Sequence, residues 1–294
     1  AVLADDNVLD AFRLANKTMA LAARRRFGTM RGKKPEEVEA PAWRPFQLAF
    51  VLMNLKGIVE PTHDDRGIVD LLFFPTGGGK TEAYLGLAAF TIVLRRLRNP
   101  SITSAGLSVL MRYTLRLLTL DQLGRASTLI CALEMERQNN VEKLGDWPFE
   151  IGLWVGRAAT PNEMGRKGDG NQNSARARTI AYKNNSQKAP PLPLEDCPWC
   201  GTKFRPESFR LIPDNDNPAD LRITCVNRDC DFSQKNPLPI LAVDEPIYRR
   251  LPCFLIATVD KFAAMPWTGP VGGFFGLLER IPVRFFGIRV IVLA

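Results

Sequence analysis

The stretch that most constrains the fold is the glycine-rich loop Pro75-Thr76-Gly77-Gly78-Gly79-Lys80-Thr81, with Glu82 after it. The apolar run 68–74, which precedes it, has the composition of a buried strand, and residues 82–97 after it have the pattern of a helix. A strand, a glycine loop and a helix are the context that a phosphate-binding loop needs. Successive glycines let backbone N–H groups turn toward a phosphate, and the helix adds the positive end of its dipole.

The loop assigns roles to individual side chains. Lys80 is expected to reach the β- and γ-phosphates of ATP, and Thr81 to place its hydroxyl on Mg²⁺, so these two are the candidate catalytic residues. The candidate cofactor-binding residues of the loop are Pro75, Thr76, Gly77, Gly78, Gly79, Lys80, Thr81 and Glu82. The general pattern asks for glycine where this chain has Phe74, and a plain glycine turn between a strand and a helix is the alternative.

Phe46 and Gln47 open another expected helix, residues 46–55, ahead of the loop. A glutamine amide offers both a donor and an acceptor, which matches the edge of adenine. Superfamily 2 helicases often carry an aromatic residue and a glutamine at a similar distance before the phosphate loop, and this resemblance implies that Phe46 and Gln47 are the adenine pair. The alternative is an ordinary helix start. Further upstream, residues 8–27 read as an amphipathic helix with a basic end.

Several later segments read as strands of a parallel sheet: residues 107–111, 149–155, 255–258 and 287–293. Arg112 and Thr114 follow the first of them, and Thr258 ends the third. Open α/β sheets place their ligand contacts at such carboxyl ends. In superfamily 2 helicases, which the chain resembles here, such strand ends carry threonines and basic residues that contact the nucleic-acid backbone, so the resemblance implies Arg112, Thr114 and Thr258 as candidate nucleic-acid contacts. We also expect a helix over residues 115–137.

Four cysteines form two pairs, Cys197 with Cys200 and Cys225 with Cys230. Two such turns each direct two thiolates at one tetrahedral ion, so the spacing predicts a zinc ribbon. Four thiolates leave no open coordination position, which indicates a structural Zn²⁺. The ribbon either braces an insertion or touches nucleic acid or a partner, and the sequence leaves this open.

The charge of the chain favours an anionic partner. The formal net charge is +8 and the pI is about 9.3, which suits nucleic acid, although ordinary solubility explains it equally well. With six cysteines, no secretory signal and no run of 18 apolar residues, we expect a cytoplasmic protein without a membrane span. The chain begins without Met and stops within an apolar run, so we expect a piece of a longer protein.

Asp244 and Glu245 follow four apolar residues and so imitate a Walker B motif, which holds Mg²⁺ and the attacking water. Pro246 favours another interpretation, in which Asp244 caps a short helix over residues 247–251. If the last apolar strand carries the true Walker B motif, its acidic residues lie beyond Ala294.

Five motifs together resemble the helicase-like component of the bacterial DISARM antiphage defence system, within helicase superfamily 2. They are Arg44-Pro45-Phe46-Gln47, residues 74–82, residues 111–119, the helix 125–134, and Thr258-Val259-Asp260-Lys261-Phe262. The resemblance covers most of residues 10–275 and ceases after Glu279, and a second RecA-like domain is absent. It implies ATP hydrolysis that drives movement along DNA, other defence-system proteins as partners, and a Walker B motif after Phe262.

The expected fold class is α/β: a RecA-like P-loop NTPase domain with a parallel sheet, plus a small zinc ribbon insertion. The expected division is an N-terminal helical segment 1–40, RecA-like parts 41–158 and 238–294, a flexible basic insertion 159–190 and a zinc ribbon 191–237. Because superfamily 2 sites take an arginine from a second such domain, we expect this chain alone to bind nucleotide weakly and hydrolyse it poorly.

A different class of protein fits some of the same features. In that alternative the chain is a nucleic-acid-binding zinc-ribbon module. Its basic residues bind the nucleic acid, and its P-loop is degenerate or does not drive movement. DNA-stimulated ATPase activity would favour the motor, and DNA binding that survives Lys80→Ala would favour the module.

Overall fold

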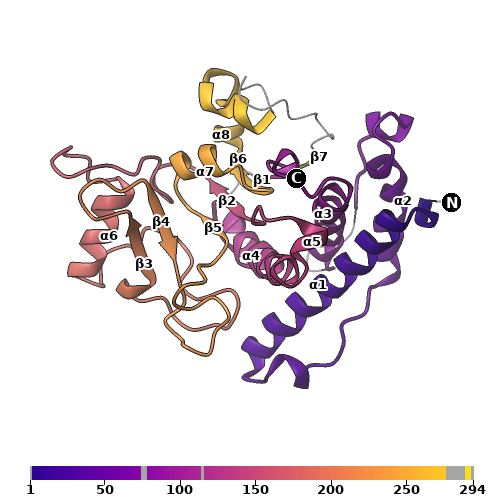
Figure 1. The fold of residues 1–294 in the computed structure, drawn as a ribbon, viewed down its shortest axis with the longest axis horizontal. Coiled ribbons are helices and arrows are strands. Elements are labelled where there is room, and N and C mark those ends of the chain that lie inside the picture. Colours follow the sequence, from indigo (N-terminus) through magenta and orange to yellow (C-terminus); the bar gives the residue numbers. More distant parts are fainter. Residues whose placement is uncertain (1, 74–77, 114–115, 276–288, 293–294) are drawn as a thin grey trace.

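A five-stranded parallel sheet organises the protein, in the strand order β5-β2-β6-β1-β7 (Figure 1). The computed structural model describes residues 2–73, 78–113, 116–275 and 289–292. The strands are β1 Val109–Tyr113, β2 Ile151–Trp154, β5 Ile240–Leu241, β6 Phe254–Thr258 and β7 Arg289–Val292. A separate antiparallel hairpin consists of β3 Phe209–Ile212 and β4 Asp220–Ile223.

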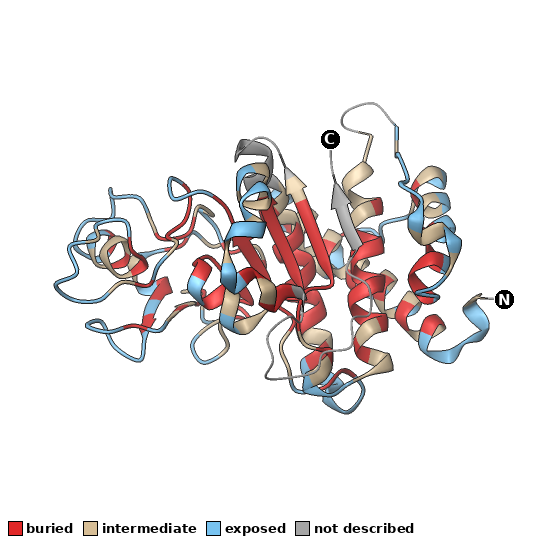
Figure 2. Cartoon of the chain, turned by 90° about the horizontal axis from the view of Figure 1, so that it is seen from above, coloured by how far each residue is buried: buried red, intermediate tan, exposed pale blue. Residues whose placement is uncertain are grey.

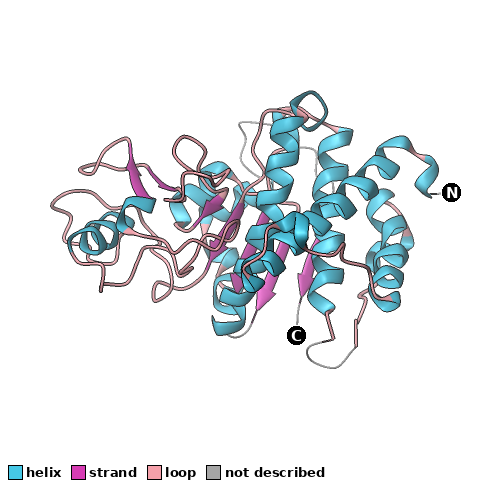
Figure 3. Cartoon of the chain, turned by 90° about the horizontal axis from the view of Figure 1, so that it is seen from below, coloured by secondary structure: helices cyan, strands magenta, loops and turns pink. Residues whose placement is uncertain are grey.

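The alternation of side chains along each strand divides the core between the two faces of the sheet. Val109 and Met111 of β1 belong to a large apolar cluster shared with the helices on one face. Leu110 between them belongs to a smaller cluster on the other face, together with Trp154 and Leu255. Figure 2 shows the buried strands between these layers, and Figure 3 shows helices lying across the sheet.

Helices pack on the face of the sheet that carries the larger apolar cluster, and one of them begins at the glycine loop. The long helices are α1 Asp6–Arg31, α2 Pro45–Val59, α3 Lys80–Arg98 and α4 Arg116–Asn139. The short ones are α5 Val141–Leu144, α6 Ala175–Asn184, α7 Asp244–Arg250 and α8 Val259–Ala263, with a 3₁₀ segment over Gly269–Phe275. Helix α1 packs against both α3 and α4. Among the described residues, no helix is both long and apolar enough to cross a membrane.

Most expected elements are present, with shifted ends. Apolar patterns predicted α1, α3 and α4, the segment that begins at Phe46 predicted α2, and short apolar runs predicted β1, β2, β6 and β7. The composition of residues 159–190 gave no indication of α6, whose buried contacts include Tyr182 against Phe209 of the hairpin. The expected domain boundaries stay predictions.

The expected strand over residues 68–74 is not formed in the part that the structure describes. Residues 68–73 have no regular secondary structure, and Val69 and Phe73 are 92% and 87% exposed. An apolar run becomes a strand only where a neighbouring strand accepts its hydrogen bonds, and no described strand pairs with these residues. Phe74 and the first loop residues, Pro75, Thr76 and Gly77, lie outside the described residues.

Candidate functional site

A cavity of about 590 Å³ lies where α1, α3 and α4 meet the described end of the glycine loop. Gly79, Lys80, Thr81, Glu82 and Gln47 all line it, so the structure brings these sequence-predicted residues together. Gly79 is the N-cap of α3 with φ of +90°, a left-handed conformation that favours glycine. It offers no side-chain acceptor to the first turn, whose N–H groups suit an anion.

Arginines that the sequence analysis did not assign to the site also line this cavity. Arg26 of α1, Arg44 ahead of α2 and Arg125 of α4 join Lys80, and Glu82 is the one carboxylate among the lining residues. Glu82 accepts a charge-assisted hydrogen bond from Arg125 and lies 3.7 Å from Arg26. The wall is therefore net positive, as a polyphosphate would require. Only tertiary packing could reveal this set, because it combines residues of α1, α3 and α4 with a residue that precedes α2.

Gln47 is fixed by the loop that it faces. Its Nε2 donates to the carbonyl of Gly79 at 2.7 Å, and its Oε1 accepts from the backbone N–H of Arg44 at 2.8 Å. Arg44 in turn donates to the carbonyl of Gly78 at 2.7 Å. Gln47 is buried, so these bonds hold the start of α2 against the glycine loop. Phe46 is half-buried and does not line the cavity, whereas Phe27 of α1 does.

The four predicted zinc ligands converge. The Sγ atoms of Cys197, Cys200, Cys225 and Cys230 all lie within 4.8 Å of one another, which makes this the one metal-binding group of its kind among the described residues. Cys197 and Cys230 are 4.0 Å apart, and Cys200 and Cys225 are 3.5 Å apart. A tetrahedral ion with Zn–S bonds of about 2.3 Å needs sulfur separations of about 3.8 Å, so the cluster fits Zn²⁺.

The thiols of this cluster act on one another. Hydrogen bonds from Cys197 and Cys230 lower the pKa of the Cys200 thiol. Hydrogen bonds with Cys200 and Cys230 raise the pKa of the Cys197 thiol. Cys131 and Cys253 lie outside the cluster in the apolar core, where burial raises the pKa of each thiol, that of Cys253 to about 12. These two cysteines are packing residues.

Comparison with known proteins places this geometry in a biological context. No model of a known protein family matches the chain. Over 250 residues, 82% of its length, the chain is 42% identical to a curated protein of Bacillus paralicheniformis. That relative is DISARM protein DrmA. The predicted resemblance to a DISARM component is confirmed. The matched region is 22% of DrmA, so the chain spans about a fifth of its relative.

Two nucleic-acid candidates of this DrmA-like chain, Arg112 and Thr258, lie at the carboxyl end of the sheet, as predicted. Arg112 pairs in register with Ala257, one step before Thr258 on the neighbouring strand. The Arg112 guanidinium stacks on the Phe262 ring at 5.5 Å. Thr258 is the N-cap of α8 without a side-chain capping bond. Thr114 lies outside the described residues. Whether these residues bind nucleic acid stays a prediction.

Asp244 and Glu245 are engaged in structural contacts. Lys261 pairs with the buried Asp244 carboxylate, and the N–H of Met164 donates to Glu245 Oε2 at 2.9 Å. Burial raises the pKa of Asp244, and Lys261 opposes that shift. The expectation that Asp244 is the N-cap of its helix was wrong: Val243 holds that position, because α7 begins at Asp244 itself. Its carboxylate serves the ion pair with Lys261 instead.

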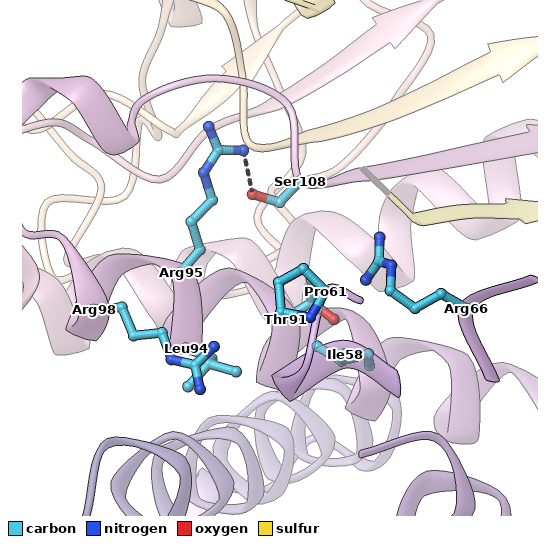
Figure 4. A pocket seen from close by; sticks show the side chains of 8 residues that line it. All are labelled: Ile58, Pro61, Arg66, Thr91, Leu94, Arg95, Arg98 and Ser108. Carbon is cyan, nitrogen blue, oxygen red and sulfur yellow. Dashed lines mark hydrogen bonds between the residues drawn. The ribbon is translucent and has the colours of Figure 1, made fainter. Parts of the chain in front are cut away.

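A second, smaller cavity of about 40 Å³ lies beside α3, near the start of β1 (Figure 4). Arg66, Arg95 and Arg98 contribute to its lining, but Figure 4 shows their guanidinium groups lying apart. Arg95 donates to the carbonyls of Leu107 and Ala105 and to the Ser108 hydroxyl. Arg95 therefore ties the end of α3 to neighbouring backbone, whereas Arg66 and Arg98 donate to the carbonyls of Gly57 and Val59 in α2, so the three guanidinium groups serve separate partners.

Proposed function

We propose that this chain is the ATP-binding part of a superfamily 2 DNA helicase or translocase that acts in phage defence. The observation that carries the proposal is the positively lined cavity in which Gly79, Lys80 and Thr81 open α3 beside Gln47. The similarity to DISARM protein DrmA supports the defence context and a role beside other defence proteins.

The described residues suggest a division of labour around the nucleotide. The first turn of α3 and Lys80 would hold the phosphates, and Thr81 would hold Mg²⁺, which supplies charge neutralisation at the transferring phosphoryl group. Arg26 and Arg125 would balance further negative charge at the mouth of the cavity, where Glu82 now holds them. Gln47 has one N–H and one lone pair left for adenine after its bonds to Gly79 and Arg44.

The test is a titration of the chain with a fluorescent ATP analogue in the presence of Mg²⁺. Lys80→Ala should weaken binding about tenfold or more, equivalent to about 1.4 kcal/mol. Lys56→Ala is the matched control, because Lys56 is exposed on α2 and does not line the cavity. If the wild-type chain does not bind, or if both variants bind like wild type, the nucleotide site is refuted.

A second candidate function, a nucleic-acid-binding surface, is favoured by an open hollow of about 920 Å³ on the cysteine-containing unit. One carboxylate, Glu207, and five exposed cations line it: Lys183, Arg205, Arg210, Arg228 and Lys235. Such an excess of positive charge suits a phosphate backbone. The double variant Arg210→Glu with Lys235→Glu should weaken DNA binding and flatten its salt dependence, whereas Lys80→Ala should not. Unchanged DNA binding by the double variant would exclude this surface.

A further inference from the structure

The cysteine cluster contacts two of the helices that line the nucleotide cavity, α1 and α4. Its first turn, Cys197-Pro198-Trp199-Cys200-Gly201, is here called the knuckle. The knuckle lies against the C-terminal part of α1 and against the middle of α4, and the loops of this unit reach toward the end of α1 in Figure 1. The metal site and the cavity therefore share two structural supports.

Arg25 makes the contact on α1. Its guanidinium covers the Trp199 ring at 4.4 Å, and its Nη2 donates to Asp231 Oδ2 at 3.3 Å. Trp199 Nε1 donates to the same carboxylate oxygen at 2.6 Å. Trp199 lies between the two cysteines of the first pair, and Asp231 follows Cys230 of the second pair. Arg25 thus contacts the segments that carry both cysteine pairs. A bound metal would fix the position of one pair relative to the other.

Thr128 makes the contact on α4. Its hydroxyl donates to the carbonyl of Pro198 in the knuckle at 2.9 Å. Thr128 also lines the nucleotide cavity. One side chain therefore contributes to the wall of the cavity and bonds to the backbone between the first two zinc ligands.

The cavity arginines lie beside these contacts. Arg26 follows Arg25 on α1, and Arg125 lies one helical turn before Thr128 on α4. Both arginines converge on Glu82, two residues after Lys80. A shift of either helix at the knuckle would therefore move Arg26 or Arg125, which contribute to the charged lining around the glycine loop.

We propose that metal binding at the cysteine cluster and nucleotide binding in the cavity are positively coupled, with Arg25 as the positioning residue that links them. The proposal rests on the nucleotide site of the proposed function. Without the metal, only contacts such as the hydrogen bond from Trp199 to Asp231 hold the two cysteine turns together, so the end of α1 has a less rigid partner. A ligand must then order Arg26 and its neighbours when it binds, which costs conformational entropy and lowers affinity.

The first experiment compares zinc-loaded wild type, Arg25→Gln and Arg13→Gln by titration with the fluorescent ATP analogue and Mg²⁺. Arg25→Gln should bind the analogue about fivefold more weakly, a size typical of coupled sites, while retaining one zinc per chain by atomic absorption. Arg13→Gln is the matched control, because Arg13 lies on the same helix, is exposed and lines no part of the cavity. Arg25→Lys, which keeps a cation for the Trp199 ring, should recover part of the affinity.

The second experiment measures the same coupling from the metal side, since coupling between two binding sites is reciprocal. The nucleotide analogue should tighten zinc binding about fivefold in wild type and in Arg13→Gln, but not in Arg25→Gln, as measured by equilibrium competition with a chromogenic chelator. If Arg25 only stabilised the cysteine cluster, Arg25→Gln would bind zinc more weakly, yet the nucleotide analogue would still tighten zinc binding about fivefold.

The outcomes separate the two proposals. If wild type binds the analogue and Arg25→Gln binds it equally well, or if nucleotide leaves the zinc affinity of wild type unchanged, the coupling is overturned and the nucleotide site stands. Equal weakening by Arg13→Gln would also overturn the coupling. If zinc-loaded wild type binds no nucleotide, both proposals are overturned together.

Discussion

Gly201 offers a sharp test of how the knuckle sits on α1. Its φ is +72°, and a Cβ added there would lie 2.2 Å from Cγ2 of Thr29. The substitution Gly201→Ala therefore imposes two separable costs, backbone strain and a clash across the interface. Gly168 is a matched position, because its φ is +85° and a Cβ there would meet nothing within 4 Å.

The magnitudes follow from these geometries. A left-handed conformation costs a residue other than glycine about 1–2 kcal/mol, and this applies to Gly168→Ala as well as to Gly201→Ala. Overpacking adds about 1–3 kcal/mol, and this applies to Gly201→Ala alone. We expect Gly201→Ala to lower the free energy of unfolding by about 2–5 kcal/mol, and Gly168→Ala by no more than about 2 kcal/mol.

The assay is denaturant unfolding followed by tryptophan fluorescence, at one fixed concentration of free zinc. Zinc must be held constant because a ligand that binds the native state changes the apparent stability. The double variant Thr29→Ala with Gly201→Ala isolates the clash, since Thr29 is exposed and its own truncation should change stability little. It should recover about 1–3 kcal/mol relative to Gly201→Ala.

Two results would refute the reasoning. Gly201→Ala could prove no more destabilising than Gly168→Ala, which would mean that the knuckle does not approach α1 this closely. Alternatively, Thr29→Ala could fail to recover any stability in the Gly201→Ala background, which would place the cost somewhere other than this contact.

Two further predictions concern the attachment and the metal of the cysteine-containing unit. Arg250→Ala removes the partner of the buried Glu150 and should destabilise by about 3–5 kcal/mol at pH 7 in denaturant unfolding. Burial already raises the Glu150 pKa against the opposing effect of Arg250. The variant should raise it further, so the deficit should shrink toward pH 4 as Glu150 takes up a proton in the native state; a constant deficit would contradict this assignment. Cys230→Ala should abolish the single zinc measured by atomic absorption and lower the thermal midpoint, whereas Cys131→Ala should keep the zinc. Retention of a full zinc equivalent by Cys230→Ala would show that the metal has other ligands.

The candidate site divides into a part that local sequence indicates and a part that it does not. Gly79, Lys80 and Thr81 are recognisable because a phosphate loop is a continuous stretch with its own backbone requirement. The cysteine pairs are recognisable because metal geometry restricts their spacing. No local pattern identifies Arg26 and Arg125 as site residues. A charged residue on a helix is expected to be solvent-exposed unless its neighbours in the fold are known.

The secondary structure divides in a similar way. Periodic apolar residues on α1, α3 and α4 predicted helices because one face of each must be buried. The apolar run 68–74 predicted a strand, yet residues 68–73 lie exposed without regular structure. Strand formation depends on a neighbouring strand that supplies hydrogen bonds, and the residues of the apolar run do not specify that neighbour.

The sequence by itself indicated the glycine-rich loop, the four cysteines that come together in space, the helices with a clear apolar face and the resemblance to a DISARM component. These are local patterns, in which the residue types are set by the structure of a short segment of the chain. Only the tertiary structure decided that Asp244 pairs with Lys261, that Gln47 holds the glycine loop, and that Arg25 joins the cysteine cluster to α1. The physical reason is that such contacts join residues distant in the chain, and their energies depend on the packing of whole helices.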